Sequence, residues 1–166
     1  MASTHYYMNL ALTTQEASSC TRRHVGCIII NEGRVVSTGY NFHPRKCDND
    51  DVCLRRMLAD DRGEPVKSNT SLEEGACIHA EMNALLFADY KDIVGSKVFV
   101  THPPCPMCTR LLIQGQVKEV HYIGSLDPSC RHLIDFLLPS TRFHRWGIQD
   151  GVPRWISLYV PASYQD

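Results

Sequence analysis

Two short segments carry residues that could together bind a metal ion and move a proton. They are Cys77-Ile78-His79-Ala80-Glu81-Met82-Asn83-Ala84 and Pro104-Cys105-Pro106-Met107-Cys108, which supply an imidazole, a carboxylate and two thiols. A structural zinc site normally has four protein ligands, whereas a catalytic site has three and keeps one position for water. His79, Cys105 and Cys108 make three ligands, so the sequence predicts a catalytic zinc (Zn2+) site.

The spacing of the two thiols suits the start of a helix. Cys105 and Cys108 are three positions apart and would lie on one face of a helix. Pro106 is tolerated in a first turn, where its missing N–H costs nothing, and the helix dipole there favours thiolate over thiol. With a neutral imidazole, the metal and its ligands would sum to zero formal charge. Open sites of this type bring bound water to a pKa of about 7.

Glu81 is predicted to be the catalytic residue and not a fourth ligand, which would close the open position. A carboxylate there can take a proton from metal-bound water and return it to the substrate. Hydrolytic deamination needs this, because hydroxide attacks a carbon whose exocyclic amine must leave as ammonia. A C-x-x-C pair alone also fits a structural zinc site or a redox pair, and H-x-E alone indicates almost nothing. H-x-E followed by P-C-x-x-C, however, is the pattern of the zinc deaminases.

The elements that must position these residues alternate between helix and strand. Helical patterns cover about 6–18, 81–90, the segment from Cys105, and 129–138; strand patterns cover 26–30, 34–40, 97–101, 117–123 and 156–160. A strand–helix–strand order implies a right-handed parallel crossover. We expect an α/β fold, a three-layer α/β/α sandwich with a mixed sheet of about five strands. The metal would lie between the N-termini of two adjacent helices. Residues 41–75 have no strong period, and we interpret them as a long loop.

The whole chain is typical of a globular protein with one domain, residues 1–166. Its hydrophobic content is 43%, its charged content 21% and its formal net charge −1. The absence of a Lys/Arg-rich run argues against a nucleic-acid partner. Neither a signal peptide nor an apolar span is visible, so no membrane association is expected. Eight cysteines without a secretion signal indicate a reducing, cytoplasmic location.

Four local patterns resemble the deoxycytidylate (dCMP) deaminases of the cytidine deaminase-like superfamily. They are Cys20-Thr21-Arg22-Arg23-His24-Val25-Gly26, Gly39-Tyr40-Asn41, His79-Ala80-Glu81-Met82-Asn83-Ala84 and Thr101-His102-Pro103-Pro104-Cys105, within a motif core of about residues 20–123. The resemblance implies deamination of dCMP to dUMP and ammonia by a zinc-bound hydroxide, which feeds thymidylate synthesis. It also implies that Glu81 shuttles the proton and that Asn41 bonds the 3′-hydroxyl. A homo-oligomer, often a hexamer, and regulation by dCTP and dTTP are further implications. Phe42 departs from the family's usual glycine, which bears on the nucleotide and effector contacts.

Other residues are candidates for substrate contacts. Arg22 and Arg23 precede the first strand, and a 5′-monophosphate needs one or two cations, so we predict that at least one of them binds phosphate. The alternative is a solvated helix end. Ala80 and Tyr122 are further candidates, although Tyr122 is equally well explained as a core or edge tyrosine.

A second, structural zinc is predicted from four more cysteines: Cys20, Cys47, Cys53 and Cys77. Their positions resemble those of dCMP deaminases that carry such a site, and four thiolates would close a tetrahedron. His43 could replace one of them. The alternative is four unrelated buried thiols. Cys27 and Cys130 are assigned to core packing, and His102 to the turn before the two prolines.

Three other functions fit part of these observations. A dCTP or modified-dCMP deaminase differs only in the shape of its pocket. A tRNA or single-stranded DNA deaminase would want a basic or aromatic stacking surface. A catalytically inactive zinc-binding sensor would have no need of Glu81.

Overall fold

The computed structural model describes residues 3–44, 53–65, 75–137 and 139–161. Its helices and strands, in chain order, are α1 (Thr4–Thr14), the 3-10 turn η1 (Gln15–Ala17), β1 (Gly26–Asn31), β2 (Arg34–Tyr40), α2 (Leu54–Arg62), α3 (Ala80–Leu86), α4 (Tyr90–Ile93), β3 (Lys97–Val100), α5 (Pro106–Gln114), β4 (Glu119–Ile123), α6 (Pro128–Leu137), β5 (Arg142–Gln149) and β6 (Val152–Leu158).

The strands form one mixed sheet in the order β2-β1-β3-β4-β5-β6. β1 pairs antiparallel with both β2 and β3, β3–β4–β5 are parallel, and β6 returns antiparallel along β5. The parallel pair β3–β4 is joined through α5, as the strand–helix–strand pattern predicts. The segment with Cys105 and Cys108 therefore lies between the central strands β3 and β4, and the segment with His79 and Glu81 precedes β3.

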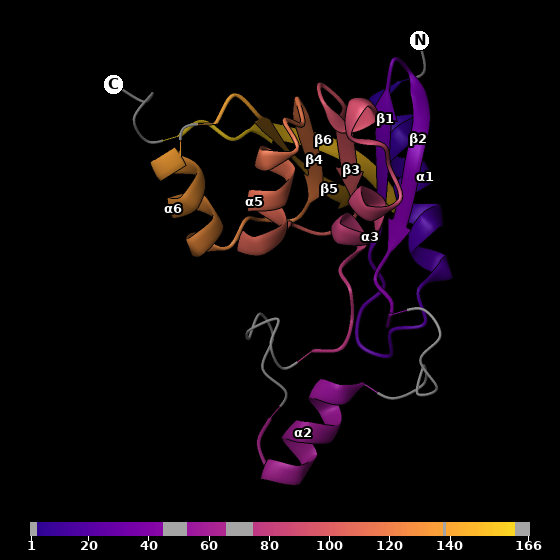
Figure 1. Ribbon diagram of the computed structural model, residues 1–166, viewed down its shortest axis with the longest axis vertical. Helices are drawn as coiled ribbons and strands as arrows, with labels where there is room; N and C mark the ends of the chain where they lie inside the picture. Colours follow the sequence, from indigo (N-terminus) through magenta and orange to yellow (C-terminus); the bar gives the residue numbers. More distant parts are fainter. Residues whose placement is uncertain (1–2, 45–52, 66–74, 138, 162–166) are drawn as a thin grey trace.

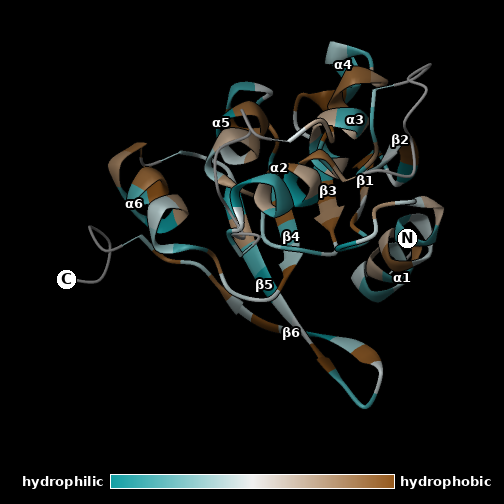
Figure 2. Cartoon of the chain, turned by 90° about the horizontal axis from the view of Figure 1, so that it is seen from below, coloured by the Kyte–Doolittle hydropathy of each residue, from teal (hydrophilic) through white to brown (hydrophobic). Residues whose placement is uncertain are grey.

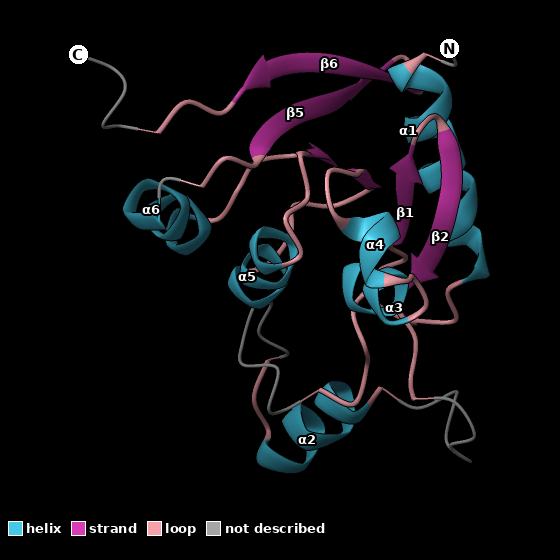
Figure 3. Ribbon diagram, turned by 45° about the horizontal axis from the view of Figure 1, so that its top comes forward, coloured by secondary structure: helices cyan, strands magenta, loops and turns pink. Residues whose placement is uncertain are grey.

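Helices cover both faces of the sheet, which makes the fold the expected α/β/α sandwich (Figures 1 and 3). One core lies under α3, α5 and α6 and includes Ala80, Val100, Leu112 and Tyr122. The second core lies under α1 and is built around Tyr7, Met8, Phe99 and Trp146. α2 lies apart from these layers, on the side where β2 ends and α3 begins (Figure 1).

Two elements differ from the sequence predictions. The segment interpreted as a loop contains α2, whose sequence LRRMLADDR is too charged to show an apolar face clearly. The sheet has a sixth strand because β5 and β6 form a hairpin, and only part of β6 was predicted. Its turn at Asp150 and Gly151 has positive φ at both residues, 51° and 74°. Asp-Gly is the preferred pair for such a two-residue turn, so this signal was present in the sequence.

Gly39 brings α3 close to the sheet. A β-carbon at this position would lie 2.2 Å from the Ala80 carbonyl oxygen and 2.4 Å from the Ala84 nitrogen. Both contacts are with backbone, which cannot rotate away as a side chain would. Gly39 thus sets the height at which α3, and with it Glu81, lies over β2.

We predict that Gly39→Ala destabilises the fold by about 3 kcal/mol or more, because overpacking of a rigid contact costs at least the usual 1–3 kcal/mol. It should also weaken zinc binding, since α3 begins directly after His79. Urea unfolding and zinc content measure the two effects.

Gly26→Ala is the matched control. Its β-carbon would meet the backbone of α1 at 2.2 Å, on the other side of the sheet from α3. It should destabilise by a similar amount but leave the zinc content of the folded fraction unchanged. Equal zinc loss in both variants would contradict the specific role given to Gly39.

Candidate active site and metal centre

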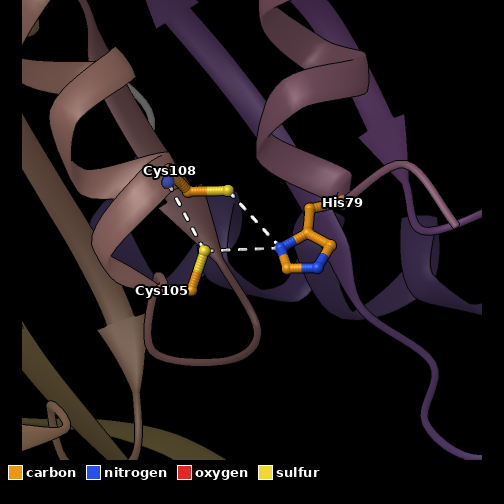
Figure 4. A group of neighbouring side chains, drawn as sticks. All are labelled: His79, Cys105 and Cys108. Atoms are coloured by element: carbon orange, nitrogen blue, oxygen red, sulfur yellow. Dashed lines mark hydrogen bonds between the residues drawn. The ribbon is translucent and has the colours of Figure 1, made fainter. Parts of the chain in front are cut away.

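His79, Cys105 and Cys108 are brought together from two separate helix starts (Figure 4). His79 Nδ1 lies 3.5 Å from the sulfur of Cys105 and 3.5 Å from that of Cys108. For a tetrahedral zinc with Zn–N near 2.05 Å and Zn–S near 2.3 Å, the N···S separation is about 3.6 Å. The three donor atoms therefore fit Zn2+ in both type and separation.

Two of these residues are helix N-caps, and Cys108 lies in the first turn of α5. His79 is the N-cap of α3, and Cys105 is the N-cap of α5 with Pro106 in the first turn. The Cys108 backbone N–H donates to the Cys105 sulfur over 3.4 Å. The prediction that the group lies between the N-termini of two adjacent helices is confirmed, and both dipoles favour negative charge there.

The ionisation of the three side chains is linked. A hydrogen bond from Cys108 lowers the pKa of Cys105 to about 4, whereas the same bond raises the pKa of Cys108. A hydrogen bond to the Cys105 thiolate raises the pKa of His79. The two cysteines thus share one proton in their hydrogen bond, which a cation bound by two thiolates would have to displace.

Glu81 lies in the first turn of α3 and is 4% exposed. Burial raises the pKa of its carboxyl to about 7, against the opposing charge of His79. The helix that carries it is tied to β2, because Ser37 Oγ donates to the Ala84 carbonyl and Asn83 Nδ2 donates to the Tyr40 carbonyl. A carboxyl group with this pKa can both accept and give up a proton near neutrality.

Asn41 holds the loop before β1. Its Oδ1 accepts from the backbone N–H of Val25 and from the Ser18 hydroxyl, and its Nδ2 donates to the Arg23 carbonyl. The Ser18 hydroxyl lies 2.7 Å from the Asn41 carbonyl oxygen and 2.8 Å from Oδ1, so its one proton is shared between them. One of the two Nδ2 protons is used by Arg23. Ser18, which the sequence did not suggest, is buried and also accepts from the Cys20 backbone N–H.

The Arg23 guanidinium contacts the His102 ring, with 2.6 Å between Nη1 and Nε2. The backbones of both Arg22 and Arg23 contact Cys20, and these contacts and the charge of Arg22 help the Cys77 hydrogen bond to lower the pKa of Cys20.

Two of the three described cysteines of the predicted structural site, Cys20 and Cys77, are in contact, but the sulfurs of Cys20, Cys53 and Cys77 do not all lie within 4.8 Å of one another. A hydrogen bond from Cys77 lowers the pKa of Cys20 to about 4, and the same bond raises that of Cys77. Cys53 is close enough for its charge to act on Cys77 as well. Cys47, the fourth predicted ligand, lies outside the described residues.

Ala80 and Tyr122 are both buried in the core under α3, α5 and α6, with exposed fractions of 0% and 2%. Cys27 and Cys130 are buried as predicted. Cys130 has a further contact, because its Sγ donates to the Pro104 carbonyl over 3.2 Å. α6 is thereby tied to the residue just before Cys105, a contact that could not be predicted from the sequence.

A second group of metal-ligand types, Glu119, His121 and His144, lies in the sheet within 4.8 Å. Trp146 Nε1 donates to His121 Nδ1, so the His121 proton is on Nε2, which donates to Glu119 over 3.1 Å. That nitrogen has no lone pair left for a metal. Lys97 and Arg142 also contact Glu119. We interpret the group as a buried ion-pair network.

This network predicts a loss of stability in weak acid. Burial, together with the charge of His144, lowers the pKa of His121 from 6.5 to about 4, so the folded protein binds fewer protons there than the unfolded chain. Stability is therefore complete above pH 6.5 and falls as pH drops toward 4. One such histidine lowers the free energy of unfolding by about 2 kcal/mol between pH 7 and pH 5.

Zinc-saturated protein unfolded in urea at several pH values measures this slope. His121→Gln, whose amide can still donate to Glu119, should lose that much less stability between pH 7 and pH 5. His132 is exposed, so His132→Gln is the control and should keep the wild-type slope. A wild-type slope in His121→Gln would assign the pH dependence to other groups.

A search of the described residues finds no helix that is both long and apolar enough to span a bilayer. The family model described as the cytidine and deoxycytidylate deaminase zinc-binding region matches residues 1–124. Among curated proteins, the deoxycytidylate deaminase of Mycobacterium phage D29 is 33% identical over 119 residues, which cover 70% of this chain and 91% of that one. Those of Saccharomyces cerevisiae and Homo sapiens are 37% and 31% identical over 72% of this chain, which spans 37% and 63% of their lengths.

The fold has a solved counterpart in the dCMP deaminase from the cyanophage S-TIM5, crystallised with dCMP and dUMP. The TM-score is 0.61 at 24% identity, over 84% of this chain and 93% of that one. This likeness concerns the fold. Because the family model matches residues 1–124 and the phage enzyme is similar over most of both chains, the chain belongs to the cytidine and deoxycytidylate deaminase family and carries that family's zinc-binding region.

Proposed function

We propose that the protein is a zinc-dependent dCMP deaminase, which converts dCMP and water to dUMP and ammonia. The observation that carries the proposal is the placement of buried Glu81 two residues from His79, whose Nδ1 is 3.5 Å from each of two cysteine sulfurs. Three ligands and a separate buried carboxyl are what hydrolytic deamination requires. The names of the phage, yeast and human relatives point to dCMP as the substrate.

His79, Cys105 and Cys108 would hold the zinc. When bound, zinc is a Lewis acid that would lower the pKa of water, so that water could attack the pyrimidine C4 carbon as hydroxide. Glu81 would take a proton from that water at its carboxylate oxygen. It would then pass the proton to the substrate, so that the exocyclic amine leaves as ammonia. Its buried position in the first turn of α3, two residues after His79, suits both transfers.

The substrate side of the proposal uses Asn41, Ala80, Tyr122 and the arginines. The second Nδ2 proton of Asn41 is the one that could donate to a 3′-hydroxyl oxygen, since its other bonds hold the Ser18–Val25 loop. Burial of Ala80 and Tyr122 limits them to shaping the wall behind the base. Phosphate binding falls to at least one of the exposed arginines, Arg22 and Arg23.

Ammonia release from dCMP, dCTP, CMP and deoxycytidine tests the substrate. Turnover confined to dCMP would support the proposal. Turnover of dCTP would move the assignment to a triphosphate-accepting deaminase, with Phe42 the first residue to vary. Inactivity on all four, but activity on tRNA or single-stranded DNA, would replace the proposal by a polynucleotide deaminase.

We include a structural zinc in the proposal, held by Cys20, Cys53 and Cys77 with Cys47 as the predicted fourth ligand. The hydrogen-bonded Cys20–Cys77 pair supports it, with Cys53 near enough for its charge to act on Cys77. Zinc binding would have to draw the three sulfurs closer, since they are not all within 4.8 Å of one another. Protein purified without chelator should contain two zinc ions per chain, and Cys53→Ala should contain one. A wild-type content of one would dispose of the second site.

A homo-oligomer, a cytoplasmic location and regulation by dCTP and dTTP complete the proposal. Exposed apolar side chains support self-association, among them Leu86 at 70% and Phe87 at 56%. The β5–β6 hairpin, which projects beyond the helices and carries hydrophobic segments, adds Trp155 (Figure 2). Light scattering at several concentrations tests the assembly. Rates with added dCTP or dTTP test the regulation.

A further inference from the structure

Arg23 is held at both ends by neighbours from other parts of the chain. Asn41 Nδ2 donates to its backbone carbonyl over 2.8 Å. At the other end, Nη1 of the guanidinium lies 2.6 Å from Nε2 of His102. The residue is exposed, yet its backbone and its charged group are both fixed, which is unusual for a surface arginine.

His102 can make this contact only as an acceptor. A guanidinium donates and never accepts, so Nε2 must present its lone pair and the ring proton must be on Nδ1. Burial, with the charges of Arg23 and His79, lowers the pKa of His102 to about 4. The ring is therefore neutral near pH 7 and orients the guanidinium without cancelling its charge, as a carboxylate would.

The location of this pair matters for the reaction. His102 follows β3 and comes three residues before Cys105, and its ring is near enough to His79 to feel the charge of that residue. Both arginines also contact Cys20 through their backbone, and the charge of Arg22 acts on it as well. The guanidinium of Arg23 differs in its contact with His102, three residues before Cys105.

We propose that His102 is a positioning residue that holds Arg23 ready for the 5′-phosphate of the substrate, and that Arg23, not Arg22, is the phosphate-binding cation. The inference rests on the proposed function. One of the five guanidinium N–H groups is used by His102, and the other four suffice for a bidentate phosphate contact. Fixing the side chain beforehand removes an ordering cost that binding would otherwise carry.

The experiment compares dCMP with deoxycytidine, which lacks the phosphate. His102→Leu removes the acceptor and should raise the KM for dCMP about tenfold, with kcat within twofold of wild type and kcat/KM for deoxycytidine unchanged. His102→Gln keeps an acceptor oxygen and should recover part of the loss. His24→Leu is the matched control, because His24 is the exposed neighbour of Arg23 and should leave both substrates unaffected.

A double-mutant cycle tests the route of the effect. Arg23→Leu should raise the KM for dCMP more than His102→Leu does, and the two changes together should do no more than Arg23→Leu alone. Arg22→Leu should leave KM near wild type. If deoxycytidine turns over too slowly to measure, inhibition constants for dUMP and deoxyuridine give the same comparison of ligands with and without the 5′-phosphate.

Three outcomes would overturn the inference. Equal losses on dCMP and deoxycytidine would mean that His102 only supports the loop before Cys105. Full additivity of His102→Leu and Arg23→Leu would separate the two residues. A KM effect from Arg22→Leu alone would select the other cation. Inactivity of the wild-type protein on dCMP is a different result, because it overturns the proposed function itself.

Discussion

Glu81→Gln is expected to lower kcat for dCMP deamination about 10³-fold while zinc content stays at the wild-type value, since positioned acid–base groups contribute roughly 10²–10⁴. Gln has nearly the same shape as Glu and can fill the same buried space in the first turn of α3. It cannot take a proton from water. The loss should therefore appear in kcat, with KM for dCMP changed little.

Metal analysis beside steady-state rates measures this result, and thermal unfolding shows whether the variant is folded. Glu16→Gln, an exposed carboxyl in η1, is the control and should retain wild-type rates. Substantial turnover by Glu81→Gln would refute the assignment of Glu81 as proton shuttle. Loss of zinc along with activity would instead assign Glu81 a part in holding the metal group together.

Cys108→Ala is expected to remove the catalytic zinc and reduce activity below about 1% of wild type, because two protein ligands rarely retain zinc at a site that needs three. Cys108 is buried, and in the metal-free protein it shares a proton with Cys105. Cys105→Ala should behave in the same way. If the structural zinc is present, each variant should keep one zinc per chain.

The matched control is Cys27→Ala, since Cys27 is also a fully buried thiol. It should lose some stability through the cavity that it leaves but retain both zinc and activity. Retention of zinc in Cys108→Ala at the wild-type level would contradict the three-ligand site. Zinc loss from all three variants would indicate general unfolding.

Local sequence patterns predicted most of the elements that carry the site. The turn at Glu32-Gly33 between β1 and β2 and the N-terminal position of Cys105 and Pro106 in α5 depend on residues close together in the chain. For that reason their chemistry could be interpreted without tertiary information. α2 was missed because it is only nine residues long and five of them are charged, and β5 because it has no regular alternation of buried and exposed positions.

The sequence by itself determined the family pattern, the α/β alternation and the residue types able to bind zinc. Only the tertiary structure decided which distant residues meet: His102 with Arg23, Ser18 with Asn41, and Cys130 with Pro104. It also showed that the Arg23 guanidinium contacts His102, whereas the sequence offers no way to tell Arg23 from its equally charged neighbour Arg22. The physical reason is that helix and strand patterns depend on neighbouring residues, whereas these contacts depend on how the sheet brings loops from separate strands to one edge.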